Sequence, residues 1–67
     1  LVVRGVRVET RDVVLVKGIV EAREGIAVVF AEKGGDLTIC APSGRERELD
    51  ELVDDLCTDL GAMRIAL

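Results

Sequence analysis

Apolar side chains recur at helical spacing in the last third of the chain. The repeating positions are Leu49, Leu52, Val53, Leu56, Cys57 and Leu60. Because residues three and four apart share one face of an α-helix, this stripe predicts a helix over residues 43–60 with one buried face. Ser43 and Glu46 have the Ser-x-x-Glu spacing of an N-terminal capping box, and Gly61 suits the left-handed conformation that ends helices. The helix is therefore expected to begin at Ser43 and to stop at Gly61.

Two strand-like runs precede this helix, at residues 26–31 and 37–41. Gly34 and Gly35 lie between them and can adopt the positive φ values that tight hairpin turns require. Successive side chains of a strand alternate between its two faces. This places Thr38 and Cys40 on the face opposite Leu37, Ile39 and Ala41. The pattern predicts a β-hairpin in which Cys40 points away from the helices.

The first 25 residues allow two interpretations. Residues 1–8 are apolar and rich in Val, as in a strand. The next segment has one apolar helical face, formed by Val13, Val16, Ile19, Val20 and Ala22. With Thr10 or Asp12 as cap and Gly25 as stop, this favours a helix over residues 10–24. The β-branched residues and Gly18 lower helix propensity, so a β-hairpin over residues 1–20 stays open as the alternative.

A last strand is expected at residues 63–67, where Met, Ile and Leu alternate with Arg and Ala. The resulting order predicts an α+β fold, a ferredoxin-like βαββαβ sandwich whose four-stranded antiparallel sheet has two helices on one face. Residues 1–67 then form a single domain. The open face of this sheet is expected to carry Thr38, Cys40 and Arg64 with the small or charged residues of the first two strands, and to serve as an interface.

The segment 8–29 reads VETRDVVLVKGIVEAREGIAVV, which would run from a first strand into a helix and through a glycine into a second strand. In this order it resembles the opening half of ACT-type regulatory domains. The whole chain is also similar to small bacterial domains of unknown function. The ACT-type resemblance implies a βαββαβ fold that pairs with a second copy and holds a small effector near Thr10, Arg11 and Asp12. ACT-type domains commonly carry a glycine at the start of that helix, where this chain has Glu9, Thr10, Arg11 and Asp12.

Charge is unevenly distributed. The net charge is −4, and residues 45–59 hold two Arg against seven Asp and Glu, a local sum of −5. An acidic chain lacks the clustered Lys and Arg with which proteins bind nucleic acids and anionic membranes. We therefore expect neither nucleic acid nor a membrane as a partner. RNA-recognition domains of the same topology stack bases on aromatic side chains of the central strands, and the expected central strands have none.

The number and spacing of the cysteines and the length of the apolar runs indicate in which cellular compartment the domain is expected. Cys40 and Cys57 do not form a disulfide framework or a Cys-x-x-Cys pair. No apolar run reaches the roughly 18 residues of a membrane-spanning helix. We expect a cytoplasmic domain with two free thiols.

The residue types argue against catalysis. The chain has no His to act as a base for Ser43, Cys40 or Cys57. Carboxylates recur four residues apart in two rows of the second helix, Glu46, Asp50 and Asp54, and Glu51, Asp55 and Asp59. These rows face away from the apolar stripe, so a solvated surface is favoured over a metal site. We expect no enzyme activity, no catalytic residues, no metal and no cofactor.

Two functions remain. The first is a non-catalytic module that self-associates as a homodimer and holds a small-molecule effector at the subunit interface. The alternative is a protein-interaction module whose acidic helix, residues 45–59, docks on a basic protein partner. A chain of 67 residues buries little core, and small domains often gain stability by oligomerising, which favours the first.

Overall fold

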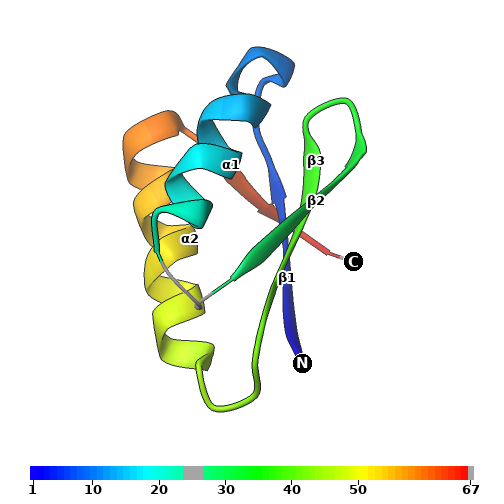
Figure 1. The fold of residues 1–67 in the computed structure, drawn as a ribbon. Coiled ribbons are helices and arrows are strands. Elements are labelled where there is room, and N and C mark those ends of the chain that lie inside the picture. The colour runs from blue at the N-terminus through cyan, green and yellow to red at the C-terminus, as the bar shows by residue number, and fades with distance from the viewer. Residues whose placement is uncertain (24–26, 67) are drawn as a thin grey trace.

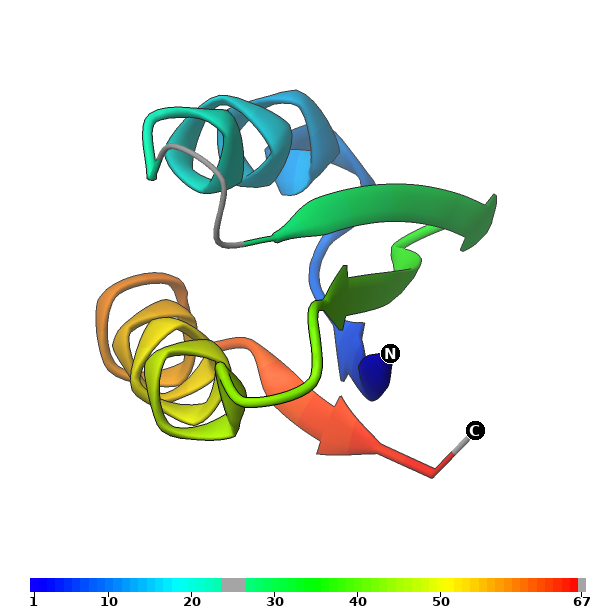
Figure 2. The ribbon, with the colours of Figure 1, turned by 60° about the horizontal axis from the view of Figure 1, so that its bottom comes forward.

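The computed structural model describes residues 1–23 and 27–66. The elements are β1 (Val2–Arg7), the 3₁₀ turn η1 (Thr10–Asp12), α1 (Val13–Glu21), β2 (Val28–Lys33), β3 (Asp36–Ala41), α2 (Glu46–Leu60) and β4 (Met63–Ile65). The strands form one antiparallel sheet in the order β2-β3-β1-β4, and both helices lie on one side of it (Figures 1 and 2). The predicted ferredoxin-like α+β fold is confirmed. The predicted helix stop at Gly25, strand start at Ile26 and strand end at Leu67 lie outside the described residues.

The core lies between the helices and the covered face of the sheet. Its fully buried large side chains are Val6 of β1, Val16 and Val20 of α1, Leu37 and Ile39 of β3, and Leu49, Leu52, Val53 and Leu56 of α2. Burying a Val, Leu or Ile side chain contributes about 1.5–3 kcal/mol, which is more than the worth of a helix cap. The predicted apolar stripe therefore sets the orientation of α2.

Residues 13–21 form a helix, so the alternative β-hairpin over residues 1–20 is wrong. Val16 and Val20 of α1 are completely buried, and Val13 and Ile19 pack against the core. This burial outweighs the low helix propensity of β-branched side chains. Neither predicted cap is used, because η1 leads into α1 and the Asp12 side chain makes no capping hydrogen bond.

The predicted capping box at the start of α2 is wrong. The helix begins at Glu46 and has no side-chain cap. Gly44 has a φ of 96° and interrupts the helical path, and the Arg45 N–H donates to the carbonyl of Pro42 at 3.1 Å to close a turn. The Ser43 hydroxyl accepts a hydrogen bond from the Leu1 nitrogen at 3.3 Å, while the Glu46 carboxylate accepts one from the Gly44 N–H at 2.8 Å. The two side chains of the expected box thus serve the turn and β1 instead of the helix.

Glycines end α2 and form the β2–β3 turn, as predicted, and Gly35 of that turn is also required by a close backbone contact. Gly61 ends α2 with a φ of 67°, and its N–H donates to the carbonyl of Cys57 at 3.1 Å. In the β2–β3 hairpin only Gly34 has a positive φ, of 59°. Gly35 is required by close approach, because a Cβ there would lie 1.7 Å from the carbonyl oxygen of Val8. The Val8 N–H donates to the Gly35 carbonyl at 2.9 Å, which joins the hairpin to the end of β1.

Replacing Gly35 by Ala is expected to lower the free energy of unfolding by about 3 kcal/mol, the upper end of overpacking costs, because the clash is with backbone. Urea unfolding followed by far-UV circular dichroism measures this change, since the chain has no Trp or Tyr. The matched control is Gly18→Ala in α1, where an added Cβ meets nothing within 4 Å and helix propensity improves. Equal stability of the two variants would contradict the assigned role of Gly35.

Candidate functional site

The sheet leaves one face uncovered, and the strand register defines its residues. Cys40 of β3 lies opposite Val3 of β1 and Val28 of β2. Thr38 lies opposite Gly5 and Phe30 in the same way. On β4, Met63 pairs with Arg7 and Ile65 pairs with Gly5. The open face, as we call it below, consists of Val3, Gly5 and Arg7 of β1, Val28 and Phe30 of β2, Asp36, Thr38 and Cys40 of β3, and Met63 and Ile65 of β4.

Most of the open face is apolar. The exposed fractions are 57% for Val28, 54% for Phe30, 61% for Met63 and 39% for Val3. The expectation of small or charged residues from the first two strands is therefore wrong for Val3, Val28 and Phe30. Isolated exposed apolar side chains are ordinary, but a contiguous apolar patch on a small domain is typical of an interaction surface.

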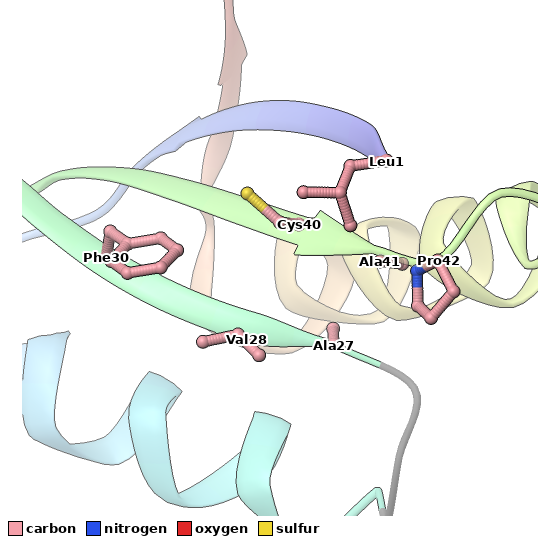
Figure 3. Close-up of a pocket in the computed structure, with 7 residues that line it drawn as sticks. All are labelled: Leu1, Ala27, Val28, Phe30, Cys40, Ala41 and Pro42. Atoms are coloured by element: carbon pink, nitrogen blue, oxygen red, sulfur yellow. The ribbon is translucent and has the colours of Figure 1, made fainter.

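A hollow of about 370 Å³ indents the open face between β2 and the end of β3 (Figure 3). Its lining is formed by Leu1, Ala27, Val28, Phe30, Cys40, Ala41 and Pro42. The close-up shows the Cys40 thiol lying between Phe30 and Leu1. None of these seven side chains is charged. The side chains that line the hollow therefore fit an apolar group.

One ion pair occupies the hairpin end of the open face. The Arg7 guanidinium donates to Asp36 at 2.6 Å from Nε and at 3.2 Å from Nη2. This hydrogen bond lowers the pKa of the Asp36 carboxyl and raises the pKa of the Arg7 guanidinium. The two charges cancel, so the open face is nearly neutral.

The predicted place of Arg64 is wrong. Arg64 pairs with Val6, whose side chain is completely buried under the helices, so Arg64 lies on the covered side of β4 and not with Thr38 and Cys40. Its guanidinium donates to Asp54 of α2 at 2.7 Å and to Asp50 at 3.4 Å. The interaction with Asp54 raises the pKa of Arg64. Arg64 therefore ties the short edge strand β4 to α2.

Arginines from other elements offset part of the acidity of the α2 surface. Arg4 of β1 donates to both carboxylate oxygens of Asp50, at 2.9 and 3.4 Å. This contact is the main reason that the pKa of Asp50 lies below its usual value. Arg23, just beyond α1, pairs with Asp55 at 2.7 Å. The rows of carboxylates thus hold β1, β4 and the end of α1 against α2.

The predicted effector residues Thr10, Arg11 and Asp12 lie together in η1. Arg11 pairs with Glu9 at 2.9 Å on the surface. In the part of the chain that the structure describes, these three residues do not line the hollow, nor a second indentation formed by Arg7, Val8, Glu9, Leu60, Gly61 and Met63. Effector binding at η1 stays a prediction.

Among residues 1–23 and 27–66, no three His, Cys, Asp or Glu side chains are grouped so that they could hold a metal ion. Neither α1 nor α2 is long and apolar enough to span a membrane. Cys40 and Cys57 are both free and half-buried, and Cys57 packs against the core.

The sequence did not predict that Val28 and Phe30 of β2 lie on the open face. Val28 and Phe30 alternate with Val29 and Ala31, so both faces of β2 read as apolar. Alternation of polarity could therefore not distinguish them. The available signal was in β3, where the less apolar Thr38 and Cys40 alternate with Leu37, Ile39 and Ala41 and so mark which face of the sheet is uncovered.

The fold and the open face define a small ferredoxin-like domain with one helix-covered and one uncovered apolar sheet face. The chain belongs to a family described as a domain of unknown function, DUF4911, whose sequence model matches residues 6–59. No curated protein and no solved structure is significantly similar to the chain. The family match agrees with the expected small domain of unknown function and gives no support to the ACT-type resemblance, which stays a prediction.

Asp50→Asn is expected to destabilise the fold at pH 7, because the neutral amide loses the charge-assisted bonds from Arg4 and Arg64. Since the folded-state pKa of Asp50 is lowered, its contribution is present above the usual value of 3.8 and is lost as the pH falls through the lowered folded value. The difference between variant and wild type in urea unfolding should therefore shrink at a pH well below 3.8.

Glu51→Gln is the matched control for this measurement. Glu51 is exposed on the same helix, and among residues 1–23 and 27–66 it has no ion pair. Its neutralisation should leave stability within about 0.5 kcal/mol of the wild type. A loss as large as that of Asp50→Asn, or a loss for Asp50→Asn that does not change with pH, would contradict the assigned role of the Arg4–Asp50–Arg64 contacts.

Proposed function

We propose that this domain is a non-catalytic self-association module and that two copies join through the open face of the sheet. The observation that carries the proposal is the set of exposed apolar side chains on the face that the two helices leave uncovered, Val3, Val28, Phe30 and Met63, together with the half-buried Ile65. Removing apolar surface from water contributes about 25 cal/mol per Å². A second copy supplies a surface of the same size and character.

The distribution of charge supports this arrangement. The net charge is −4, and the local sum of −5 lies on the α2 segment, which packs on the opposite side of the sheet (Figure 2). When two open faces meet, the acidic helices lie on the outer sides of the dimer, where repulsion between them is most strongly screened. Association through the helices would bring like charges together.

Size also favours a second copy. The domain exposes 4208 Å² in total, and a standard interface takes about 800 Å² from each partner. The area of one broad side of a two-layer domain with this total surface is of the same order as that required from each partner. A domain of 67 residues also gains stability when association buries more apolar surface.

The alternative function, docking of α2 on a basic partner, has weaker support. Asp50, Asp54 and Asp55 already pair with Arg4, Arg64 and Arg23. A basic partner would have to displace these contacts. The non-catalytic part of the proposal rests on the absence of His from the sequence, which leaves Cys40 and Cys57 without the usual base.

Phe30→Asp tests the proposal. The wild-type domain is expected to sediment as a reversible dimer, and the variant to bind its own kind about 100-fold more weakly, because an anchor worth about 1.5–3 kcal/mol is replaced by a charge. Sedimentation velocity over a range of concentrations measures both. Circular dichroism checks that the variant is folded, which is expected because Phe30 is half-exposed on the edge strand β2.

The matched control is Val14→Asp on α1, at a position 80% exposed and outside the open face. This variant should keep the wild-type association. A wild-type domain that stays monomeric at high concentration, or a dimer that Phe30→Asp leaves intact, would overturn the proposal.

A further inference from the structure

A hollow and a projecting side chain occupy opposite corners of the open face. The hollow lies between β2 and the end of β3 that carries Cys40. Met63 begins β4 on the other edge of the sheet, opposite Arg7 at the far end of β1. Its side chain is 61% exposed. The two features therefore lie on a diagonal of one face.

The strand register gives the dimensions of this diagonal. Along β1, the Val3–Cys40 pair and the Arg7–Met63 pair are separated by four residues, or about 13 Å at the usual strand rise. Across the sheet, β2 and β4 are separated by three strand intervals, or about 14 Å. The diagonal is thus inclined at about 45° to the strands.

We propose that Met63 of each copy inserts into the hollow of the other copy and contacts Phe30 there. This inference rests on the proposed self-association through the open face. In a two-fold dimer each surface patch meets its own counterpart reciprocally, so one insertion implies the second. In this dimer the Met63 corner of each copy meets the hollow of the other copy. Because the diagonal between these corners is inclined at about 45° to the strands, the strands of the two copies cross near a right angle, which is one of the two ways in which sheets pack.

The chemistry of the two corners is complementary. Methionine is unbranched and flexible, so it fits irregular apolar spaces, and its sulfur makes favourable contacts with aromatic rings. The hollow has Phe30 at its wall, aliphatic side chains around it and the Cys40 thiol between Phe30 and Leu1 (Figure 3). Its seven lining residues include no charged side chain that would orient a polar ligand. Because one face carries both the hollow and the side chain that fits it, a second copy is the occupant.

An intermolecular nuclear Overhauser effect tests this contact directly. Phe30 is the only Phe and Met63 the only Met of the chain, so both resonances are unique. Equal amounts of a copy labelled only at the Met methyl and a copy protonated at the Phe ring are mixed. We expect a cross-peak between the Met63 Cε methyl and the Phe30 ring. Within one copy the two residues lie on opposite edge strands, about 14 Å apart, too far to produce it.

Two variants of Met63 and one control variant give an independent readout. Met63→Glu should weaken dimerisation at least tenfold in sedimentation, Met63→Leu should retain it, and Val14→Glu on α1 is the control that should not change it. A dimer that Phe30→Asp dissociates but that shows no Met63–Phe30 cross-peak would overturn the inserted Met63 and leave the proposed function standing. A monomeric wild type would overturn both.

Discussion

Burial of the leucine stripe of α2 against one face of the sheet is the interaction on which the rest of this structure depends. Leu49, Leu52 and Leu56 are almost completely buried, together with Leu37 and Ile39 of the central strand β3. Two helices suffice to cover one face of a four-stranded sheet and no more. The chain therefore has a covered face that holds its core and an open face whose apolar side chains stay in contact with water.

The charged residues follow from the same layering. The outer rows of α2 are acidic, and arginines of β1 and β4 on the helix side of the sheet reach them. Asp50 accepts hydrogen bonds from both Arg4 and Arg64, and Asp54 binds Arg64 at 2.7 Å. Partly exposed ion pairs contribute little individually, but these orient β4, which is only three residues long, against the helix. Part of the acidity that first suggests a binding surface is thus used inside the domain.

The open face combines three properties. It is apolar from β2 to β4, it is nearly neutral because Arg7 and Asp36 cancel, and it is indented by a hollow next to the only aromatic residue. Apolar surface drives association without direction, whereas a hollow and a matching side chain determine how two surfaces align. Self-association through this face therefore accounts for both its composition and its shape.

The sequence by itself determined the elements and their order. The stripe in α2, the glycine at position 61 and the Gly34-Gly35 turn are local patterns, and local spacing decides whether a segment forms a helix, a strand or a turn. Residues 13–21 were an exception, because β-branched side chains left two interpretations open and burial in the core resolved the segment as a helix. The start of α2 escaped prediction because the conformation of Gly44 places Ser43 in a turn beside Leu1.

Only the tertiary structure decided which face the residues of β2 and β4 occupy. In β2 both alternating sets are apolar, so polarity could not distinguish Val28 and Phe30 from Val29 and Ala31. The pairing of Arg64 with Val6 placed this arginine on the helix side of the sheet, although the alternation in residues 63–67 had suggested the open face. Strand register depends on pairing between residues far apart in the chain, and a shift of one residue exchanges the two faces. For that reason the elements could be predicted from local sequence, while of the open face only Thr38 and Cys40 of β3 were placed correctly.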